Sequence, residues 1–435
     1  MKSRLERYFQ FQELGTNWRT EILAGVTTFV TMAYIIFVNP SILHETGMPL
    51  EAVVAATCLC AAFGSILMGT LARYPVALAP GMGLNAYFTY SVVKALGVPW
   101  QTALGAVFLS GLAFLVLTAA GIRQMIVSAI PFDLYAAVAV GIGLFIAFIG
   151  LRNSGIITGS SATLVTMGNL RAPNTLLSIF GLLLISALLA WKIRAAILIG
   201  ILGTAGLGAV LGLVRWQPET YSFTSITATA FQLDIRGALR YGLIEIVFVF
   251  LFVDLFDNIG TLVAVGKEAR LFDQTGRIPR VNRILFADAT ATIVGSLAGT
   301  STVTSYIESA AGVVAGGRSG VTAMTTGLLF AVAMVVAPLV GAIPGAATAP
   351  ALIVVGSLMI AHAVEIPWKD PVLAVPAFLT IVTIPLTFSI ANGLAFGFTA
   401  YTILKVARGQ FREVSWLVYL LTLLFIARFF YLGSG

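Results

Sequence analysis

Long apolar runs, separated by short polar stretches, make up most of this chain of 435 residues. A helix needs about 20 consecutive apolar residues to cross the hydrocarbon core of a bilayer. Runs near that length predict twelve ordinary membrane helices, at Glu21–Asn39, Leu50–Leu71, Gln101–Ala120, Phe132–Gly150, Asn174–Trp191, Ala195–Val214, Tyr241–Gly266, Ile284–Leu297, Val321–Val340, Ala346–Ala363, Pro371–Phe388 and Asn392–Val406. The pattern is typical of an all-α polytopic membrane protein.

Two further apolar segments, Pro75–Val93 and Thr300–Val314, are too short or too interrupted to be ordinary spans. Proline and glycine residues, among them Pro80 and Gly83, break the first, and the second is a β-branched, hydroxyl-rich run. Extended backbone at membrane depth is tolerated only where protein buries it or where it lines a cavity. We therefore predict that each segment is a short strand running into a half-helix, which makes them spans 3 and 10 of fourteen.

The chain also repeats itself weakly. The matches follow the same order in both halves: Gly64-Ser65 with Gly295-Ser296, Ile130-Pro131 with Ile343-Pro344, and Pro173 and Gly200 with Pro371 and Gly397. Seven predicted spans precede Leu211 and seven follow it, and an odd number turns the second copy upside down. The sequence thus predicts 7+7 inverted repeats, a design of secondary transporters that hold their substrate near the bilayer midplane.

Composition and charge agree with a membrane location. Hydrophobic residues make up 59% and charged residues 10% of the chain, and the mean hydropathy is +0.98, whereas a soluble domain carries about 25% charged residues. With fourteen crossings and a cytoplasmic N-terminus, eighteen of the 25 Lys and Arg residues lie inside, six outside and one, Arg428, in an apolar C-terminal stretch. Basic residues favour the cytoplasmic side. The net charge of +7 therefore reflects topology in a cell (inner) membrane and does not indicate nucleic-acid binding.

Two carboxylates, Asp254 and Asp257, lie in the middle of the apolar run Tyr241–Gly266. A carboxylate at the centre of a membrane helix costs about 2.5–3.5 kcal/mol on insertion scales, and such residues usually mark a functional site. Residues three apart share one helix face, so we place the functional site on that face. The alternative is that both carboxylates only lock helices together through hydrogen bonds.

Other kinds of chemistry find little support. Cys58 and Cys60 lie two residues apart in one predicted helix and face different ways, and His44 and His362 are isolated. The sequence therefore predicts no metal site, and it carries no HExxH motif or similar catalytic signature. We therefore expect that the protein is not an enzyme and uses no cofactor. A channel is disfavoured as well, because the sequence shows no ring of charged residues that could line a pore.

Four segments resemble one known family. They are Thr31–Pro40, Ala79–Phe88, Phe252–Leu262 and Gly299–Gly312, and they resemble the guanine/hypoxanthine/adenine permease branch of the xanthine–uracil permease superfamily. The resemblance extends from about Asn17 to Arg408, nearly the whole chain, with its motifs in order. It implies a fourteen-span, 7+7 inverted-repeat fold, proton-coupled purine uptake and a homodimer joined through its gate domains.

The resemblance also implies a division of the chain. Residues 1–20 would form a cytoplasmic N-terminus, and residues 215–240 an external linker. Residues 21–120 (spans 1–4) and 241–340 (spans 8–11) would form a core domain, and residues 121–214 (spans 5–7) and 341–407 (spans 12–14) a gate domain. The remaining residues, 408–435, include the stretch Trp416–Leu432, which is either an interfacial helix or an extra span.

Candidate site residues follow from the same resemblance. Asp257 matches the acid of span 8 that contacts the base, and Asp254 is this branch's additional acid. Glu308 matches the residue of span 10 that binds the base, and Asn85 the asparagine of span 3. Asp288 in span 9 lies where relatives keep an aspartate, and the supporting residues are Gly83, Asn258, Thr261 and Ser309. Asn258 departs from the pattern because much of the branch has threonine there.

The chemistry of these residues is consistent with a purine substrate. A carboxylate accepts the N1–H of hypoxanthine or guanine, and with guanine also the 2-amino group. We expect Glu308 to read that edge and Asn85 to support the site, and because adenine has no N1–H, the site should favour oxopurines. The aromatic side chains of Tyr87, Phe88 and Phe252, together with Phe256, either stack on the base or pack between helices.

Proton coupling needs a group that exchanges a proton near neutral pH. Burial and a neighbouring carboxylate both favour the protonated form of an acid, so we expect Asp254 and Asp257 to carry the proton as one coupled pair, with Glu308 and Asp288 as further candidates. Two alternatives remain, a uracil or xanthine permease and an inorganic-anion carrier on the same inverted-repeat fold. An anion site would need positive half-helix ends that no acid opposes.

Overall fold

A computed structural model describes residues 2–121, 131–213, 227–240, 244–269, 279–335, 340–341 and 343–432. Several predictions fall partly outside these residues: the start of the span Tyr241–Gly266, the first part of the linker 215–240 and part of the span Val321–Val340. The described chain is mostly helical and divides into two compact units, Met1–Ala119 with Leu151–Ala351, and Ala120–Gly150 with Leu352–Gly435.

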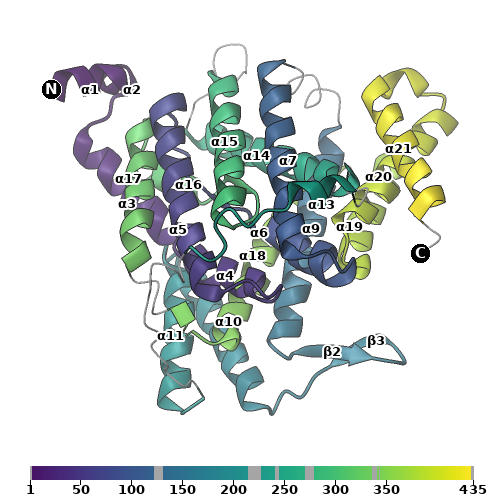
Figure 1. Ribbon diagram of the computed structural model, residues 1–435, viewed down its shortest axis with the longest axis horizontal. Coiled ribbons are helices and arrows are strands. Elements are labelled where there is room, and N and C mark those ends of the chain that lie inside the picture. Colours follow the sequence, from purple (N-terminus) through teal and green to yellow (C-terminus); the bar gives the residue numbers. More distant parts are fainter. Residues whose placement is uncertain are drawn as a thin grey trace. The chain divides into compact units, whose positions relative to one another are not determined.

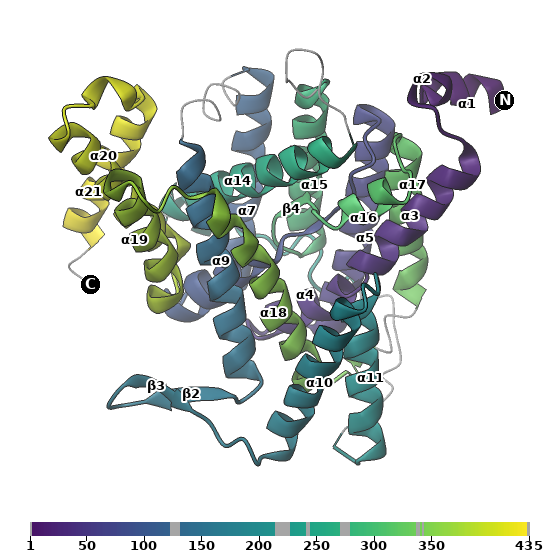
Figure 2. The ribbon, with the colours of Figure 1, turned by 180° about the vertical axis from the view of Figure 1, so that it is seen from behind.

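The first unit contains most of the helices and all four strands of the described residues (Figure 1). Its elements in chain order are α1 (Lys2–Tyr8), α2 (Phe11–Leu14), α3 (Trp18–Met32), α4 (Ile35–His44), α5 (Leu50–Leu67), the π-helix η1 (Met68–Ala72), β1 (Leu78–Pro80), α6 (Met82–Ala86), the π-helix η2 (Tyr87–Ala95), α7 (Trp100–Ala119), β2 (Ile157–Ser160), β3 (Leu164–Met167), α10 (Pro173–Ala190), α11 (Ala196–Val210), α13 (Ile235–Arg240), α14 (Ile244–Ala269), α15 (Val281–Ala298), β4 (Val303–Ser305), α16 (Ser309–Val314) and α17 (Gly320–Ala333). In this unit α15 packs on α5 and α7, while α17 packs on α3 and α5. The β2–β3 hairpin projects away from the helices before α10 (Figure 2).

The described residues of the second unit form helices and their connections, without a strand. It comprises most of α9 (Phe132–Asn153), most of α18 (Gly345–Met359), the 3₁₀-helix η4 (Ile360–Glu365), α19 (Pro371–Thr387), α20 (Ile390–Ala407), the 3₁₀-helix η5 (Phe411–Glu413) and α21 (Trp416–Leu432). The C-terminal stretch is the helix α21, which packs on α20 through a 2.7 Å hydrogen bond between the hydroxyls of Thr402 and Thr422. The expected division into core and gate domains stays a prediction.

Seven helices among the described residues are long and apolar enough to cross a membrane. The first of them, Trp18–His44, is longer than the predicted span Glu21–Asn39. It starts earlier because Asn17 caps it, accepting the backbone N–H of Thr20 at 3.0 Å. It ends later because Pro40 lies inside α4 and does not terminate it.

Both interrupted segments form a short strand followed by a short helix, as the sequence predicts. Strand β1 leads into α6, β4 leads into α16, and the two strands pair antiparallel with Ala79 opposite Thr304. Two reciprocal backbone hydrogen bonds extend this pairing on either side, from Gly81 N–H to the Thr302 carbonyl at 2.9 Å and from Tyr306 N–H to the Ala77 carbonyl at 3.0 Å. The pairing is therefore two-fold symmetric about Ala79 and Thr304.

A hydroxyl from the preceding helix supports each strand in the same manner. Ser65 on α5 accepts the N–H of Leu78 at 2.9 Å and donates to its carbonyl at 3.1 Å. Thr292 on α15 accepts the N–H of Val303 at 3.3 Å and donates to its carbonyl at 2.9 Å. These bonds satisfy backbone groups that a two-stranded sheet at membrane depth leaves open. They also make the two halves structurally equivalent at this point.

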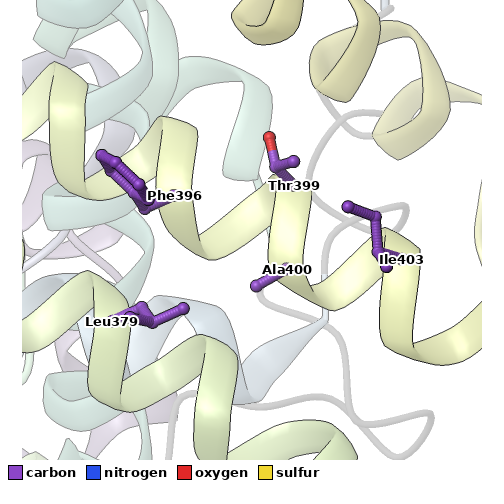
Figure 3. A pocket seen from close by; sticks show the side chains of 5 residues that line it. All are labelled: Leu379, Phe396, Thr399, Ala400 and Ile403. Carbon is purple, nitrogen blue, oxygen red and sulfur yellow. The ribbon is translucent and has the colours of Figure 1, made fainter.

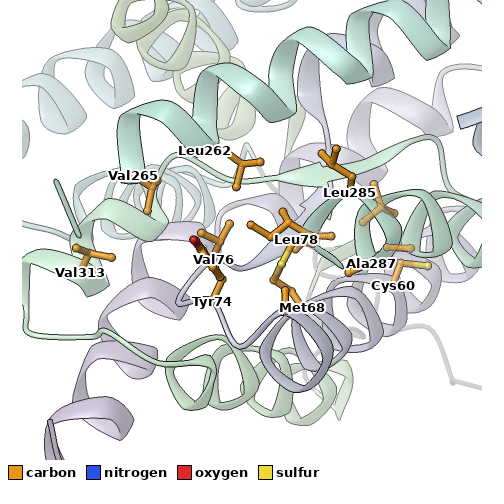
Figure 4. Packing of buried hydrophobic residues seen from close by; sticks show 14 residues of the cluster. Cys60, Met68, Tyr74, Val76, Leu78, Leu262, Val265, Leu285, Ala287 and Val313 are labelled. Carbon is orange, nitrogen blue, oxygen red and sulfur yellow. The ribbon is translucent and has the colours of Figure 1, made fainter. Parts of the chain in front are cut away.

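A buried apolar cluster surrounds the strand pair (Figure 4). It brings together side chains from α5, η1, β1, α14, α15, β4 and α16, among them Cys60, Met68, Leu78, Leu262, Leu285, Val303 and Val313. Leu78 and Val303, the equivalent strand residues, are both fully buried in it. The core of this unit therefore fixes the strands against the helices that carry the predicted acids.

A buried carboxylate near the start of α3 joins that helix to α17. Glu21 has no exposed surface and accepts hydrogen bonds from the hydroxyls of Thr16 at 2.8 Å and Thr322 at 2.6 Å. It also accepts the backbone N–H groups of Arg318 at 3.0 Å and Ser319 at 3.2 Å, just before α17 begins. A carboxylate in this place satisfies donors that the start of a helix leaves unpaired and complements the positive end of the helix.

Glu21→Ala is expected to destabilise the protein by on the order of 3 kcal/mol, because it leaves buried donors of Arg318, Ser319 and Thr322 without an acceptor. Thermal unfolding in detergent, followed by tryptophan fluorescence, measures the effect. Glu365→Ala is the control, since that side chain is 40% exposed and its ion pair with His362 is long, at 3.5 Å. Equal melting temperatures for the two variants would show that the Glu21 contacts contribute nothing to stability.

Candidate functional site

Glu308 lies at the start of α16, directly after the strand pair. Its carboxylate oxygen Oε1 accepts a 2.5 Å hydrogen bond from the phenol of Tyr34, at the turn between α3 and α4. Tyr34 is fully buried, whereas Glu308 keeps part of its side chain exposed. The phenol therefore orients the carboxylate through Oε1.

Asp257 faces the same place from α14. Its atom Oδ2 lies 3.7 Å from the position that a Cβ atom on Gly81 would occupy, so the carboxylate reaches the end of β1. Asp257 and Glu308 interact electrostatically, and Tyr306 interacts with both. The phenol of Tyr306 is anchored by a 2.5 Å hydrogen bond to the carbonyl of Pro80. Both carboxylates are partly exposed, and together they form an acidic site beside the strand pair.

The remaining polar residues of α14 continue this face of the helix. Asp254, Asp257 and Thr261 follow one another at spacings of three and four residues, and Asp254 and Thr261 are buried. Asn258 is also buried, and its side-chain carbonyl accepts the hydroxyl of Ser305 at 3.0 Å. The helix face that the sequence singles out is therefore turned, in part, toward β4.

Asn85 belongs to a buried hydrogen-bonded network. Its amide donates to the side-chain carbonyl of Asn39, and its own carbonyl accepts the hydroxyl of Ser301. Asn39 in turn donates to the hydroxyls of Thr57 at 2.7 Å and Thr300 at 3.1 Å. All five side chains are fully buried. These contacts join α4, α5 and α6 to the segment before β4, so in this conformation Asn85 holds the site together from behind.

The other predicted residues take supporting positions. Ser309 accepts the backbone N–H of Ala77 at 3.0 Å, which ties the start of α16 to the chain entering β1. Gly83 lies in the first turn of α6, and the two-fold symmetry of the strand pair makes it the counterpart of Glu308. Asp288 is fully buried on α15. The carboxylate of Glu308, next to the start of α16, therefore has no acidic counterpart in α6.

Sequence reasoning did not single out Tyr34, Tyr306, Asn39 or Ser301 as site residues. All four lie inside motifs that carry the family resemblance, yet no spacing rule connects α3 and α4 to α16. Their contacts with the predicted residues span long separations, 274 residues from Tyr34 to Glu308 and 216 from Asn85 to Ser301. Only the fold brings these side chains together.

The aromatic candidates for base stacking pack on other aromatic rings in this structure. The Tyr87 and Phe250 rings meet edge to face at 5.2 Å, and Phe88 lies 6.4 Å from the same ring. Phe252 is buried and stacks on Phe248 at 5.0 Å. The side chain of Phe256 lies outside the described residues.

A groove in the second unit has a different character (Figure 3). It measures about 410 Å³ and lies between α19 and α20, where it is lined by Leu379, Phe396, Thr399, Ala400 and Ile403. Thr399 is the single polar residue among those that line the groove. The groove therefore offers no carboxylate that could accept hydrogen bonds from a nucleobase. Among the described residues, no group of three or more His, Cys, Asp or Glu side chains could hold a metal ion.

The fold is shared with solved membrane transporters. The transmembrane domain of the cyanobacterial bicarbonate transporter BicA superposes with a TM-score of 0.68 at 18% identity, over 85% of this chain and 96% of that one. The murine anion transporter Slc26a9 in its inward-facing state gives 0.65 at 11% identity, over 90% of this chain and 69% of that one. At these identities the likeness concerns the fold alone, and it defines a polytopic transporter fold.

The family follows from the sequence comparisons. The xanthine–uracil permease model, described as a permease family, matches residues 19–396, and the chain belongs to this family. MJ0326 of Methanocaldococcus jannaschii, itself described as a permease, is 53% identical over 99% of both chains. The guanine/hypoxanthine permease PbuG of Bacillus subtilis is 45% identical over 98% of this chain and 100% of its own. The adenine permease AdeP of Escherichia coli is 44% identical over 99% and 97%.

Proposed function

We propose that this permease carries purine nucleobases, guanine and hypoxanthine in particular, across the cell membrane. The observation that supports this most directly is the pair of carboxylates, Asp257 and Glu308, that meet beside the strand pair. Purine bases are flat and neutral and rich in N–H donors, which carboxylates accept in well-defined geometry. Relatives that match over their full length are purine permeases.

Glu308 is the principal ligand in this proposal. Tyr34 holds one of its oxygens, and the other accepts the N1–H of the oxopurine. Asp257 lies across the site and accepts a second N–H or exchanges a proton. Asp254, Asn258 and Thr261 continue the polar face of α14, while Asn85 and Ser309 hold the two half-helices in place.

Protons are the coupling ion in this proposal. Two neighbouring carboxylates repel each other when both are ionised, and a proton bound to either one removes that repulsion. Uptake of a proton from outside therefore favours entry of the neutral base, and release inside completes the cycle. Asp254 and Asp288, the two buried acids on α14 and α15, are further carriers for this proton.

The proposed architecture follows the family pattern. Fourteen spans form two inverted repeats, the N-terminus is cytoplasmic, and alternating access moves a core domain against a gate domain around the bound base. The two-fold symmetry about Ala79 and Thr304, and the matching support from Ser65 and Thr292, are consistent with inverted repeats. A homodimer through the gate domains completes the proposal.

An anion carrier is the first alternative, because the solved structures with this fold include bicarbonate and anion transporters. Two carboxylates at the start of α16 and on α14 oppose an anion there. A uracil or xanthine carrier is the second alternative, since both bases also present N–H donors to a carboxylate.

Equilibrium binding to the purified protein separates these functions. We expect radiolabelled hypoxanthine to bind and to be displaced by unlabelled guanine at comparable concentration, with uracil at least about tenfold weaker. Bicarbonate and sulfate should leave the bound label unchanged. Displacement by either anion, or by uracil as readily as by guanine, contradicts the proposal.

A further inference from the structure

The buried side-chain amide of Asn258 has a hydrogen-bond donor to which the proposed binding mode assigns no acceptor. Its side-chain oxygen accepts the hydroxyl of Ser305 at 3.0 Å. Its side-chain nitrogen is buried and has no hydrogen-bond partner within the described structure. A buried donor left unpaired costs about 1–3 kcal/mol, and nearly all such groups in folded proteins find a partner.

The place of this donor connects it with the acidic site. Asn258 follows Asp257 directly, and both side chains meet the segment that runs from Ser305 to Glu308: Asn258 contacts its first residue, and Asp257 interacts with its last. An N–H donor and carboxylate acceptors thus lie along one stretch of chain. An oxopurine edge offers the complementary pair, the carbonyl oxygen O6 as acceptor beside the N1–H donor.

We propose that Asn258 is a specificity-determining residue that donates its side-chain N–H to the O6 carbonyl of a bound 6-oxopurine. This inference rests on the proposed function, and it names the part of that site which distinguishes hypoxanthine and guanine from adenine. Adenine carries an amino group where the oxopurines carry O6. The N–H donors of Asn258 and of this amino group would then face each other, and neither would have an acceptor. Ser305 is a positioning residue in this proposal, because its hydroxyl donates to the amide oxygen and leaves the amide nitrogen to donate to the ligand.

The arrangement predicts a preference for hypoxanthine over adenine of roughly 5- to 150-fold, the range that one unpaired buried polar group produces. Asn258→Thr replaces the fixed donor by a hydroxyl that donates or accepts, so it should reduce the preference at least about fivefold. Ser305→Ala leaves the amide in place but frees its rotation, so the preference should fall while hypoxanthine still binds. Asn258→Asp places an acceptor there and should favour adenine.

The test measures dissociation constants of radiolabelled hypoxanthine and adenine for the wild-type protein and the three variants, each checked for folding by size-exclusion profile and melting temperature. Thr290→Ala is the matched control, because that exposed hydroxyl bonds only its own helix backbone, at 2.7 Å. Unchanged preferences in Asn258→Thr and Ser305→Ala would overturn the inference and leave purine binding standing. A wild-type protein that binds neither base would instead overturn the proposed function itself.

Discussion

Glu308→Gln is expected to weaken hypoxanthine binding by roughly 100-fold or more. Gln keeps the size of the side chain but replaces the acceptor oxygens of a carboxylate by one oxygen and one amino group. The variant therefore loses a charge-assisted hydrogen bond from N1–H, and the amide N–H of Gln can face the N1–H donor of the base. The measurement is equilibrium binding of radiolabelled hypoxanthine to the purified protein.

Tyr34→Phe is the matched comparison for this prediction. It removes the phenol that bonds Oε1 of Glu308 but keeps the carboxylate and the aromatic ring. We expect this variant to keep binding within about tenfold of wild type, because it loses orientation and not the acceptor. Nearly unchanged affinity in Glu308→Gln would mean that the carboxylate does not contact the base.

Asp257→Asn is expected to abolish accumulation driven by a proton gradient while preserving exchange of labelled for unlabelled base. The side chain keeps its shape and its place near Gly81 but cannot release or bind a proton in the range of physiological pH. Exchange needs only the binding and reorientation of the base, whereas accumulation needs the proton to move with it. Proteoliposomes loaded with unlabelled hypoxanthine measure exchange, and empty ones with an inward gradient measure accumulation.

Asp254→Asn, one turn earlier on α14, shows whether the proton belongs to one acid or to several. If Asp257 alone carries it, Asp254→Asn retains accumulation; if both carry it as a coupled pair, both variants lose it. Gradient-driven accumulation by Asp257→Asn at the wild-type rate would remove Asp257 from the proton pathway.

The interrupted segments were predictable because their composition conflicts with a membrane helix. Proline and glycine before Gly83, and the hydroxyl-rich run at Thr300–Ser305, favour extended backbone, and the structure forms β1 and β4 there. The acids were predictable for a related reason, since a carboxylate inside an apolar run is costly and rarely without function. Residues whose polarity or backbone preference does not suit a membrane helix are thus the features of a membrane protein that are easiest to predict from sequence.

Long-range partners were not predictable in the same way. Tyr34 reads as one more aromatic residue of an apolar helix until the fold places its phenol on Glu308. Glu21 reads as the polar edge of the first span, yet it is buried and accepts donors nearly 300 residues away in sequence, at Arg318 and Ser319. Asn85 was expected to support the site, but its contacts with Asn39 and Ser301 become visible only in the fold.

The fold of this chain does not determine its ligand, because anion transporters have the same fold. BicA and Slc26a9 share this chain's fold at low identity, so the strand pair and its half-helices form a framework open to different ligands. In this chain Glu308 places a carboxylate next to the start of α16, whereas the register of the strand pair makes Gly83 the corresponding residue of α6. This asymmetry of charge within a symmetric framework supports the proposal of a ligand rich in N–H donors.

Uptake of radiolabelled hypoxanthine by proteoliposomes, with and without an inward proton gradient, tests the central claim most directly. The account predicts gradient-driven accumulation that guanine competes, that an uncoupler abolishes and that Glu308→Ala loses. No uptake of hypoxanthine under any gradient, together with transport of bicarbonate or sulfate by the same vesicles, would contradict it and make the acids structural.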